Sequence, residues 1–104
     1  MIKLANVTDV PEGRGIVVPA PHGQEIALFK IKGQIYALNN SCPHMGGPLG
    51  EGEIEGCVVT CPWHGWQFDV KDGSCVNMPG EEAEHIPIII KNGEIFLNQD
   101  EVNA

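Results

Sequence analysis

Apolar and polar residues alternate along both ends of the chain, a period of two that is typical of half-buried β-strands. Two neighbouring segments, Glu25–Ile31 and Gln34–Asn39, are predicted to be strands joined at Lys32-Gly33. A second predicted pair comprises Ile86–Lys91 and Glu94–Leu97, and the Asn92-Gly93 dipeptide between them favours a two-residue hairpin because both residue types tolerate positive φ. The ends of the chain therefore predict antiparallel β-structure.

Shorter signals add to this picture without changing it. Arg14–Pro19 and Trp66–Val70 are predicted as further strands, and Asp72-Gly73 as a tight turn. Thr8–Glu12 and Gly80–Glu84 are the two places where a single helical turn is expected. We therefore expect an all-β fold, a small antiparallel β-sandwich or barrel.

Glycine and proline divide the chain into flanks and a middle. They number 21 among 104 residues, and twelve of the 21 fall between Ser41 and Gly80. This length fits one small domain. We predict a single domain over residues 1–104, with a loop-rich insert at approximately 40–80.

The net charge of −8 excludes some partners. Nucleic acids and anionic membranes both require basic surfaces, so neither is expected. The charge fits either simple solubility or steering toward a basic protein partner. No secretory leader or apolar run of membrane-spanning length is recognised, and a cytoplasmic location is expected.

Four residues in the middle of the chain form the pattern that carries chemistry. Cys42 and His44 are separated by one residue, Cys61 and His64 by two, and sixteen residues lie between the pairs. Each pair is in a short run rich in proline and glycine, which lets a chain curl so that a thiolate and an imidazole approach one metal centre. Zinc is the main alternative to an iron–sulfur cluster as the group that these four residues bind. The usual spacing in zinc sites, however, pairs cysteine with cysteine and histidine with histidine.

This C-x-H and C-x-x-H pattern resembles the Rieske family, and the run Cys61-Pro62-Trp63-His64-Gly65-Trp66 is similar to its small ferredoxins. The resemblance implies a Rieske fold with a loop-rich cluster-binding subdomain and one [2Fe–2S] cluster per chain. It also implies that Cys42 and Cys61 bind one iron, and that His44 and His64 bind the other.

The resemblance further bears on the reduction potential. Relatives in cytochrome bc complexes have hydroxyl residues at the positions of Trp66 and Phe68, and bridging cysteines at the positions of Gly47 and Trp63. This chain has neither feature. The resemblance therefore implies a potential at the low end of the Rieske range, roughly −150 mV.

The remaining cysteines and histidines are expected to be structural or exposed. Cys57 and Cys75 are predicted to pack as small apolar residues, with a disulfide between them as the minor alternative in a reducing compartment. His22 and His85 are expected to face solvent. Trp63 and Trp66 fit either packing beneath the loops or an apolar rim that contacts a partner, shared with Met45 and Pro79.

The expected function is single-electron transfer rather than catalysis. The resemblance implies a ferredoxin that shuttles electrons from a flavin-dependent reductase to a terminal oxygenase, as in aromatic-ring dioxygenase systems. The alternatives are the small subunit of an assimilatory nitrite reductase and a zinc-stabilised interaction module. An oxygenase active site is not expected, because only His85 follows His64 among the histidines. Glu51, Glu53 and Glu55 either dock a basic partner or, as the sequence favours, keep the insert solvated.

Overall fold

The computed structural model describes residues 2–43, 46–63 and 65–98. Within them, nine strands form three antiparallel sheets of three strands each, with the strand orders β1-β9-β8, β2-β3-β4 and β5-β6-β7. Their bounds are β1 Ile2–Asn6, β2 Gly15–Pro19, β3 Glu25–Ile31, β4 Gln34–Asn39, β5 Glu53–Glu55, β6 Val58–Thr60, β7 Gln67–Asp69, β8 Ile88–Lys91 and β9 Glu94–Leu97. The predicted all-β class is confirmed. No helix in this part of the chain has the length and apolarity needed to cross a bilayer.

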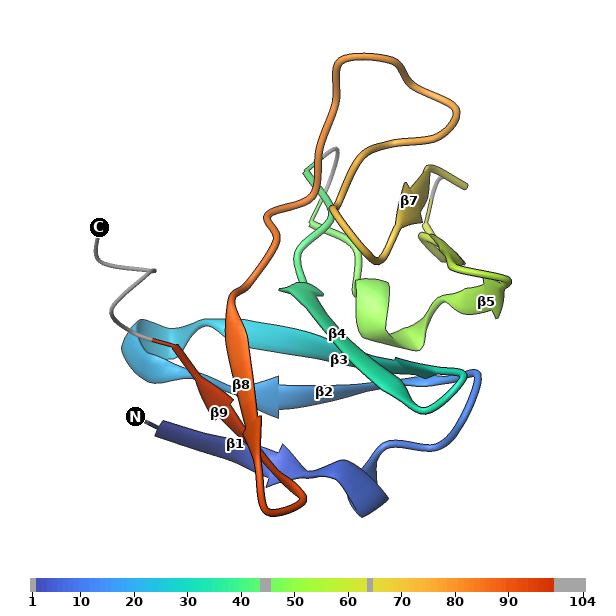
Figure 1. Ribbon diagram of the computed structural model, residues 1–104. Coiled ribbons are helices and arrows are strands. Elements are labelled where there is room, and N and C mark those ends of the chain that lie inside the picture. The colour runs from blue at the N-terminus through green and yellow to red at the C-terminus, as the bar shows by residue number, and fades with distance from the viewer. Residues whose placement is uncertain (1, 44–45, 64, 99–104) are drawn as a thin grey trace.

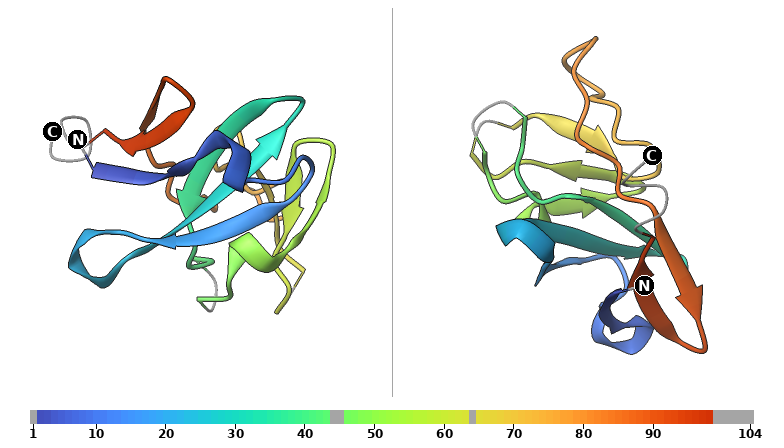
Figure 2. Two further views of the ribbon diagram at one scale, coloured as in Figure 1. Left: turned by 90° about the horizontal axis from the view of Figure 1, so that it is seen from below. Right: turned by 90° about the vertical axis from the view of Figure 1, so that its left-hand side faces the viewer.

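Strand β3 places the middle sheet between two apolar cores. Every residue of β3 from Ile26 to Phe29 is buried, which is why its sequence is almost continuously apolar. Ala27, Phe29 and Ile31 contribute to one core, whereas Ile26 and Leu28 contribute to the other. The two faces of one strand therefore hold the β1-β9-β8 sheet on one side and the β5-β6-β7 sheet on the other, as the right-hand view of Figure 2 shows.

The segments flanking the middle sheet differ in places from the expectation. The predicted insert contains its own small sheet, β5-β6-β7, and β1 was not predicted at all. Among the described residues, three short 3₁₀ turns occur, at Val7–Asp9, Pro21–Gly23 and Leu49–Glu51. The first overlaps the helical turn expected at Thr8–Glu12.

The helical turn expected over Gly80–Glu84 is wrong. Glu82 instead forms an isolated antiparallel bridge with Ser74, and the Ala83 N–H donates to the Gly73 carbonyl at 2.7 Å. These contacts draw residues 74–82 into a loop that rises to the top of the molecule in Figure 1 before the chain descends to β8. Backbone pairing across this loop consumes the groups that a helical turn needs for its own bonds.

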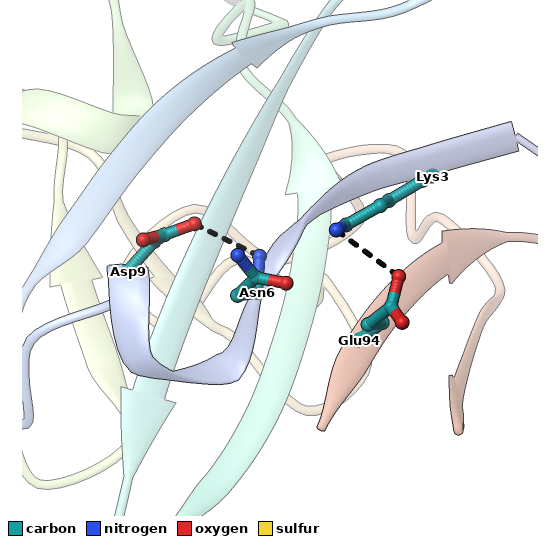
Figure 3. A network of polar contacts seen from close by, with 4 residues as sticks. All are labelled: Lys3, Asn6, Asp9 and Glu94. Carbon is teal, nitrogen blue, oxygen red and sulfur yellow. Dashed lines mark hydrogen bonds and ion pairs between the residues drawn. The ribbon is translucent and has the colours of Figure 1, made fainter. Parts of the chain in front are cut away.

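Polar contacts hold the first strand at the end of the molecule remote from that loop (Figure 3). The Lys3 ammonium lies 3.0 Å from a Glu94 carboxylate oxygen, which joins β1 to β9. The Asn6 N–H donates to the Asp9 carboxylate at 2.9 Å, at the start of the first 3₁₀ turn. Both contacts are exposed, so each stabilises the strand only modestly.

Candidate metal centre

Two loops carry the cysteines of the predicted ligand set, and their backbones are hydrogen-bonded in the same way. In the first, the Cys42 N–H donates to the Gly47 carbonyl and the Gly46 N–H donates to the Cys42 carbonyl, at 2.9 and 2.8 Å. In the second, the Cys61 N–H donates to the Trp66 carbonyl and the Gly65 N–H to the Cys61 carbonyl, at 2.7 and 3.1 Å. The two loops therefore share one backbone hydrogen-bond pattern.

Each loop contains one glycine in the left-handed backbone region, which explains why this hydrogen-bond pattern depends on residue type. Gly46 has φ 77° and Gly65 has φ 75°, each four residues after its cysteine. Only glycine adopts this backbone without steric cost. The turn that it closes brings the chain back beside the cysteine, where the two backbone hydrogen bonds form.

The structure brings the two thiol-bearing loops together. Cys42 and Cys61 are 3% and 2% exposed and belong to the same apolar core. A Cβ atom added to Gly47 of the first loop would lie 2.7 Å from Cys61 Sγ of the second, closer than atoms pack in proteins. The first loop therefore leaves a space beside the Cys61 sulfur that a side chain at residue 47 would occupy in this structure.

This donor set fits an iron–sulfur cluster better than an isolated structural thiol pair. Two buried thiols belong to one core, and in the sequence each cysteine is followed within its loop by a histidine. His44 and His64, the other two predicted ligands, lie outside the described residues. Thiolates are the protein ligands that iron–sulfur clusters require, and two imidazoles complete the Rieske type.

Aromatic residues surround the second loop in two different environments. Trp63 is 57% exposed, whereas Phe68 is fully buried and Trp66 is partly buried against the core. The Trp66 and Phe68 rings lie 6.5 Å apart between centroids. Trp66 therefore packs beneath the loops, which was the first interpretation of the tryptophans. Trp63 has the exposure that the second interpretation, an apolar rim, requires.

Gly47 and Trp63, the positions at which the resemblance implies bridging cysteines in some relatives, are neighbours here. A Cβ on Gly47 would lie 3.1 Å from Trp63 Cγ, so the indole covers the face of the glycine. The two loops are thus in direct contact at this point without a covalent bond.

The remaining candidate residues lie where packing or exposure was expected. Cys57 and Cys75 are half-buried thiols that pack against the core containing Cys42 and Cys61, and no disulfide joins them. His22 and His85 are exposed. His22 has φ 64°, which is uncommon for a residue with a Cβ and reflects its place in the tight Pro21–Gly23 turn.

Charge is distributed unevenly between the halves of the molecule. Residues 41–84 contain eight carboxylates and one lysine, so they hold seven of the eight net negative charges. Within this region Glu51 and Glu53 line a surface groove with Pro62, the residue after Cys61. Three of the four large apolar side chains that the described residues expose, namely Trp63, Val76 and Met78, also lie in this region. The cysteine-bearing end is therefore both acidic and locally apolar.

Two asparagines that sequence reasoning did not single out hold the ends of the loops. Asn40 is the one buried polar residue in the described ranges, and its Oδ1 accepts the Gly50 N–H at 2.7 Å. The Leu49 N–H donates to the Asn40 carbonyl, so both bonds close the base of the first loop. Asn77 contacts the second loop from residues 74–82. The sequence offers no signal for either, since asparagine is common in turns.

One carboxylate fixes the chain just before residues 74–82. Asp72 accepts hydrogen bonds from the Ser74 N–H at 2.8 Å and the Ser74 hydroxyl at 2.7 Å. These bonds favour the ionised form, and they hold the pKa of Asp72 below its ordinary value. The turn is thereby set in one geometry at neutral pH.

An all-β domain in which two matched loops bring two buried cysteines into one core fits a metal-binding β-protein of the iron–sulfur kind. A family model for the Rieske [2Fe–2S] domain matches residues 1–95. The chain belongs to this family, and the family implies a [2Fe–2S] cluster.

Individual relatives show which members of this family the chain is similar to. The chain is 34% identical over 100 residues to the ferredoxin component of naphthalene 1,2-dioxygenase/salicylate 5-hydroxylase systems from Ralstonia sp, and the match covers 95% of each protein. A chain in the complex of reduced oxygenase and oxidized ferredoxin in carbazole 1,9a-dioxygenase is 27% identical with a TM-score of 0.84, over 92% of this chain and 90% of that one. A putative NADH-dependent nitrite reductase small subunit from Mycobacterium tuberculosis shares the fold at 24% identity, with a TM-score of 0.82 and coverage of 91% and 90%.

Proposed function

We propose that this chain is a ferredoxin that carries single electrons from a flavin-dependent reductase to a terminal oxygenase. It is an electron carrier rather than an enzyme. The observation that carries the proposal is the pair of matched loops, which places Cys42 and Cys61 in one core, with Gly47 of the first loop close to the Cys61 sulfur of the second. Relatives named as ferredoxin components of dioxygenase systems support a role beside an oxygenase.

In this proposal one [2Fe–2S] cluster is bound per chain, by Cys42, His44, Cys61 and His64. The cluster supplies a centre that accepts and releases one electron. The cysteines hold the buried side, since both thiols lie in the core. Residues 1–104 form a single Rieske domain with a cluster-binding insert at approximately 40–80, and β5-β6-β7 supports that insert.

Matched substitutions test this ligand set. Cys42→Ser, Cys61→Ser, His44→Ala and His64→Ala are each expected to abolish stoichiometric iron and acid-labile sulfide. Cys57→Ser and His22→Ala replace the same residue types outside the loops, and are expected to leave two irons and two sulfides per chain. If the purified protein contains zinc in place of iron and sulfide, the alternative of a zinc-stabilised interaction module is favoured instead.

The site is proposed to have a low reduction potential, roughly −150 mV. Hydrogen bonds to cluster sulfurs raise the potential, and the side chains at 66 and 68 are a tryptophan and a phenylalanine with no hydroxyl to donate. Phe68 is also fully buried. A redox titration of the purified protein measures this value, and a midpoint well above zero would contradict the inference.

We further propose that the acidic end docks a basic face of each partner. The concentration of seven net negative charges in residues 41–84, with Glu51 and Glu53 beside the second loop, supports docking over simple solvation. Charge reversal at Glu53 is expected to lower the rate of electron transfer at low salt, and the difference should diminish at high salt because exposed charges are screened. Glu94→Lys reverses one charge at the remote end as the control.

The assay for function is reconstitution. Reduction by a flavin-dependent reductase followed by turnover of a terminal oxygenase is the expected result. Tight co-purification with a sirohaem subunit would favour the nitrite reductase alternative, for which the shared fold is the only support. A cytoplasmic location is also proposed, because the half-buried thiols Cys57 and Cys75 suit a reducing compartment.

A further inference from the structure

The side chain of Asn77 connects residues 74–82 to the second ligand loop. Its Nδ2 donates to the Gly65 carbonyl at 3.1 Å, and its Oδ1 accepts the Gln67 N–H at 3.0 Å. The same oxygen accepts the Cys75 thiol at 3.5 Å. We propose that Asn77 is a positioning residue that fixes the segment following His64 in place for cluster binding.

The backbone alone does not make this connection. The Val76 N–H donates to the Gln67 carbonyl at 2.7 Å, so the chain runs beside the start of β7 up to residue 76. At residue 77 the Asn77 side chain, rather than the backbone, accepts a hydrogen bond from the Gln67 N–H. A planar amide presents one donor and one acceptor together, which suits the Gly65 carbonyl and the Gln67 N–H on either side of Trp66. No aliphatic side chain provides either group, and an aspartate provides only the acceptor.

The position of Gly65 explains why such a connection matters. Gly65 directly follows His64 and occupies the left-handed region at φ 75°. Glycine has more backbone freedom to lose than any other residue, so an unrestrained loop would explore many conformations here. A hydrogen bond to the Gly65 carbonyl removes part of that freedom before the cluster binds. Ligands held in advance release a bound centre more slowly. This role rests on the proposed function, in which His64 is a ligand.

Asn77 is exposed, which makes its role separable from folding. Asn40 offers the contrast, because it is 6% exposed and its loss leaves the Gly50 N–H unpaired inside the protein. Replacing Asn77 removes bonds at the surface, where water satisfies the abandoned groups. We therefore expect Asn77 variants to fold normally and to differ from the wild type at the second loop.

The experiment compares Asn77→Ala and Asn77→Asp with Met78→Ala, a truncation of the exposed neighbour in the same loop. Each cluster-loaded protein is challenged with an iron chelator while the visible absorption is followed, and amide hydrogen exchange at Gln67 is measured in parallel. Two hydrogen bonds of ordinary strength correspond to about a tenfold change. Asn77→Ala is expected to release the cluster about tenfold faster and to exchange the Gln67 amide faster. Met78→Ala should match the wild type in both.

Asn77→Asp separates the two bonds. A carboxylate still accepts the Gln67 N–H but cannot donate to the Gly65 carbonyl. Slow exchange at Gln67 together with fast cluster release is the expected result. Wild-type release from Asn77→Ala, in protein whose thermal unfolding is unchanged, would overturn the proposal and leave the proposed function standing. A wild-type protein without a [2Fe–2S] cluster would refute the proposed function instead, whereas exchange at Gln67 would still report on the Asn77 bond.

Discussion

The contact at Gly47 between the two cysteine-bearing loops leads to a quantitative prediction for Gly47→Ala. The added Cβ would lie 2.7 Å from Cys61 Sγ and 3.1 Å from Trp63 Cγ. Uncrowded contacts between such atoms are about 3.5–4.0 Å long, so the loops must separate by roughly 1 Å. Overpacking of this kind costs about 1–3 kcal/mol of stability.

The effect on the cluster is expected to exceed the effect on folding. Metal–ligand distances hold to within about 0.2 Å, much less than the required separation. Gly47→Ala should therefore fold with moderately lower stability and contain little iron or sulfide.

Gly93→Ala is the matched control. Gly93 lies in the β8–β9 turn with φ 77°, and no atom stands within 4 Å of the position of a Cβ. An alanine there is strained by about 1–2 kcal/mol through its backbone alone. Iron and sulfide per chain and the urea unfolding midpoint are measured for both variants. Full cluster content in Gly47→Ala, or equal cluster loss in both variants, would refute the steric reasoning.

Three further predictions concern other parts of the structure. Cys57→Ser and Cys75→Ser are expected to keep the visible spectrum of the cluster, because both thiols pack outside the ligand loops; loss of that spectrum would make either residue a ligand. Asn40→Ala should lower the free energy of unfolding by about 1–3 kcal/mol, because the buried Gly50 N–H loses its acceptor, and urea titration measures this change. Glu12 accepts backbone N–H bonds from Gly33 and Lys32, which lower the pKa of its carboxyl below the ordinary 4.5. Its contribution to stability is therefore complete above about that pH and is lost as the pH falls through the lowered pKa. Glu12→Gln should be less stable than the wild type at pH 7, and the difference in stability should shrink on acidification. A difference that does not depend on pH would show that the ionised carboxylate is not the source of the stabilisation.

Local chemistry explains which elements were predictable. The bounds of β3, β4 and β9 agree with the prediction, because each is a run of several residues with a clear pattern next to a turn signal. Lys32-Gly33 and Asn92-Gly93 form the expected turns, with φ values of 51° and 78° and of 53° and 77°. Strand β8 begins at Ile88 rather than Ile86, β2 begins one residue later than predicted, and β7 is one residue shorter than predicted at each end.

Non-local contacts explain the elements that were missed. Strand β1 exists because it pairs with β9 from the far end of the chain. Strands β5 and β6 are three residues long, too short for a period to be visible. The neighbouring Gly52 shows the same dependence on distant residues, since a Cβ there would collide with the Thr60 carbonyl although its own φ is ordinary.

The sequence by itself predicted the chemistry of this protein. Two cysteines and two histidines at fixed spacing, in runs of glycine and proline, indicate the kind of centre before any fold is known, because ligand type and loop flexibility are local properties. Only the tertiary structure decided how the loops meet. The approach of Gly47 to Cys61 joins residues 14 positions apart, and the bond from Asn77 to Gly65 joins residues 12 positions apart. Such contacts depend on how the sheets stack, and no local pattern encodes that stacking.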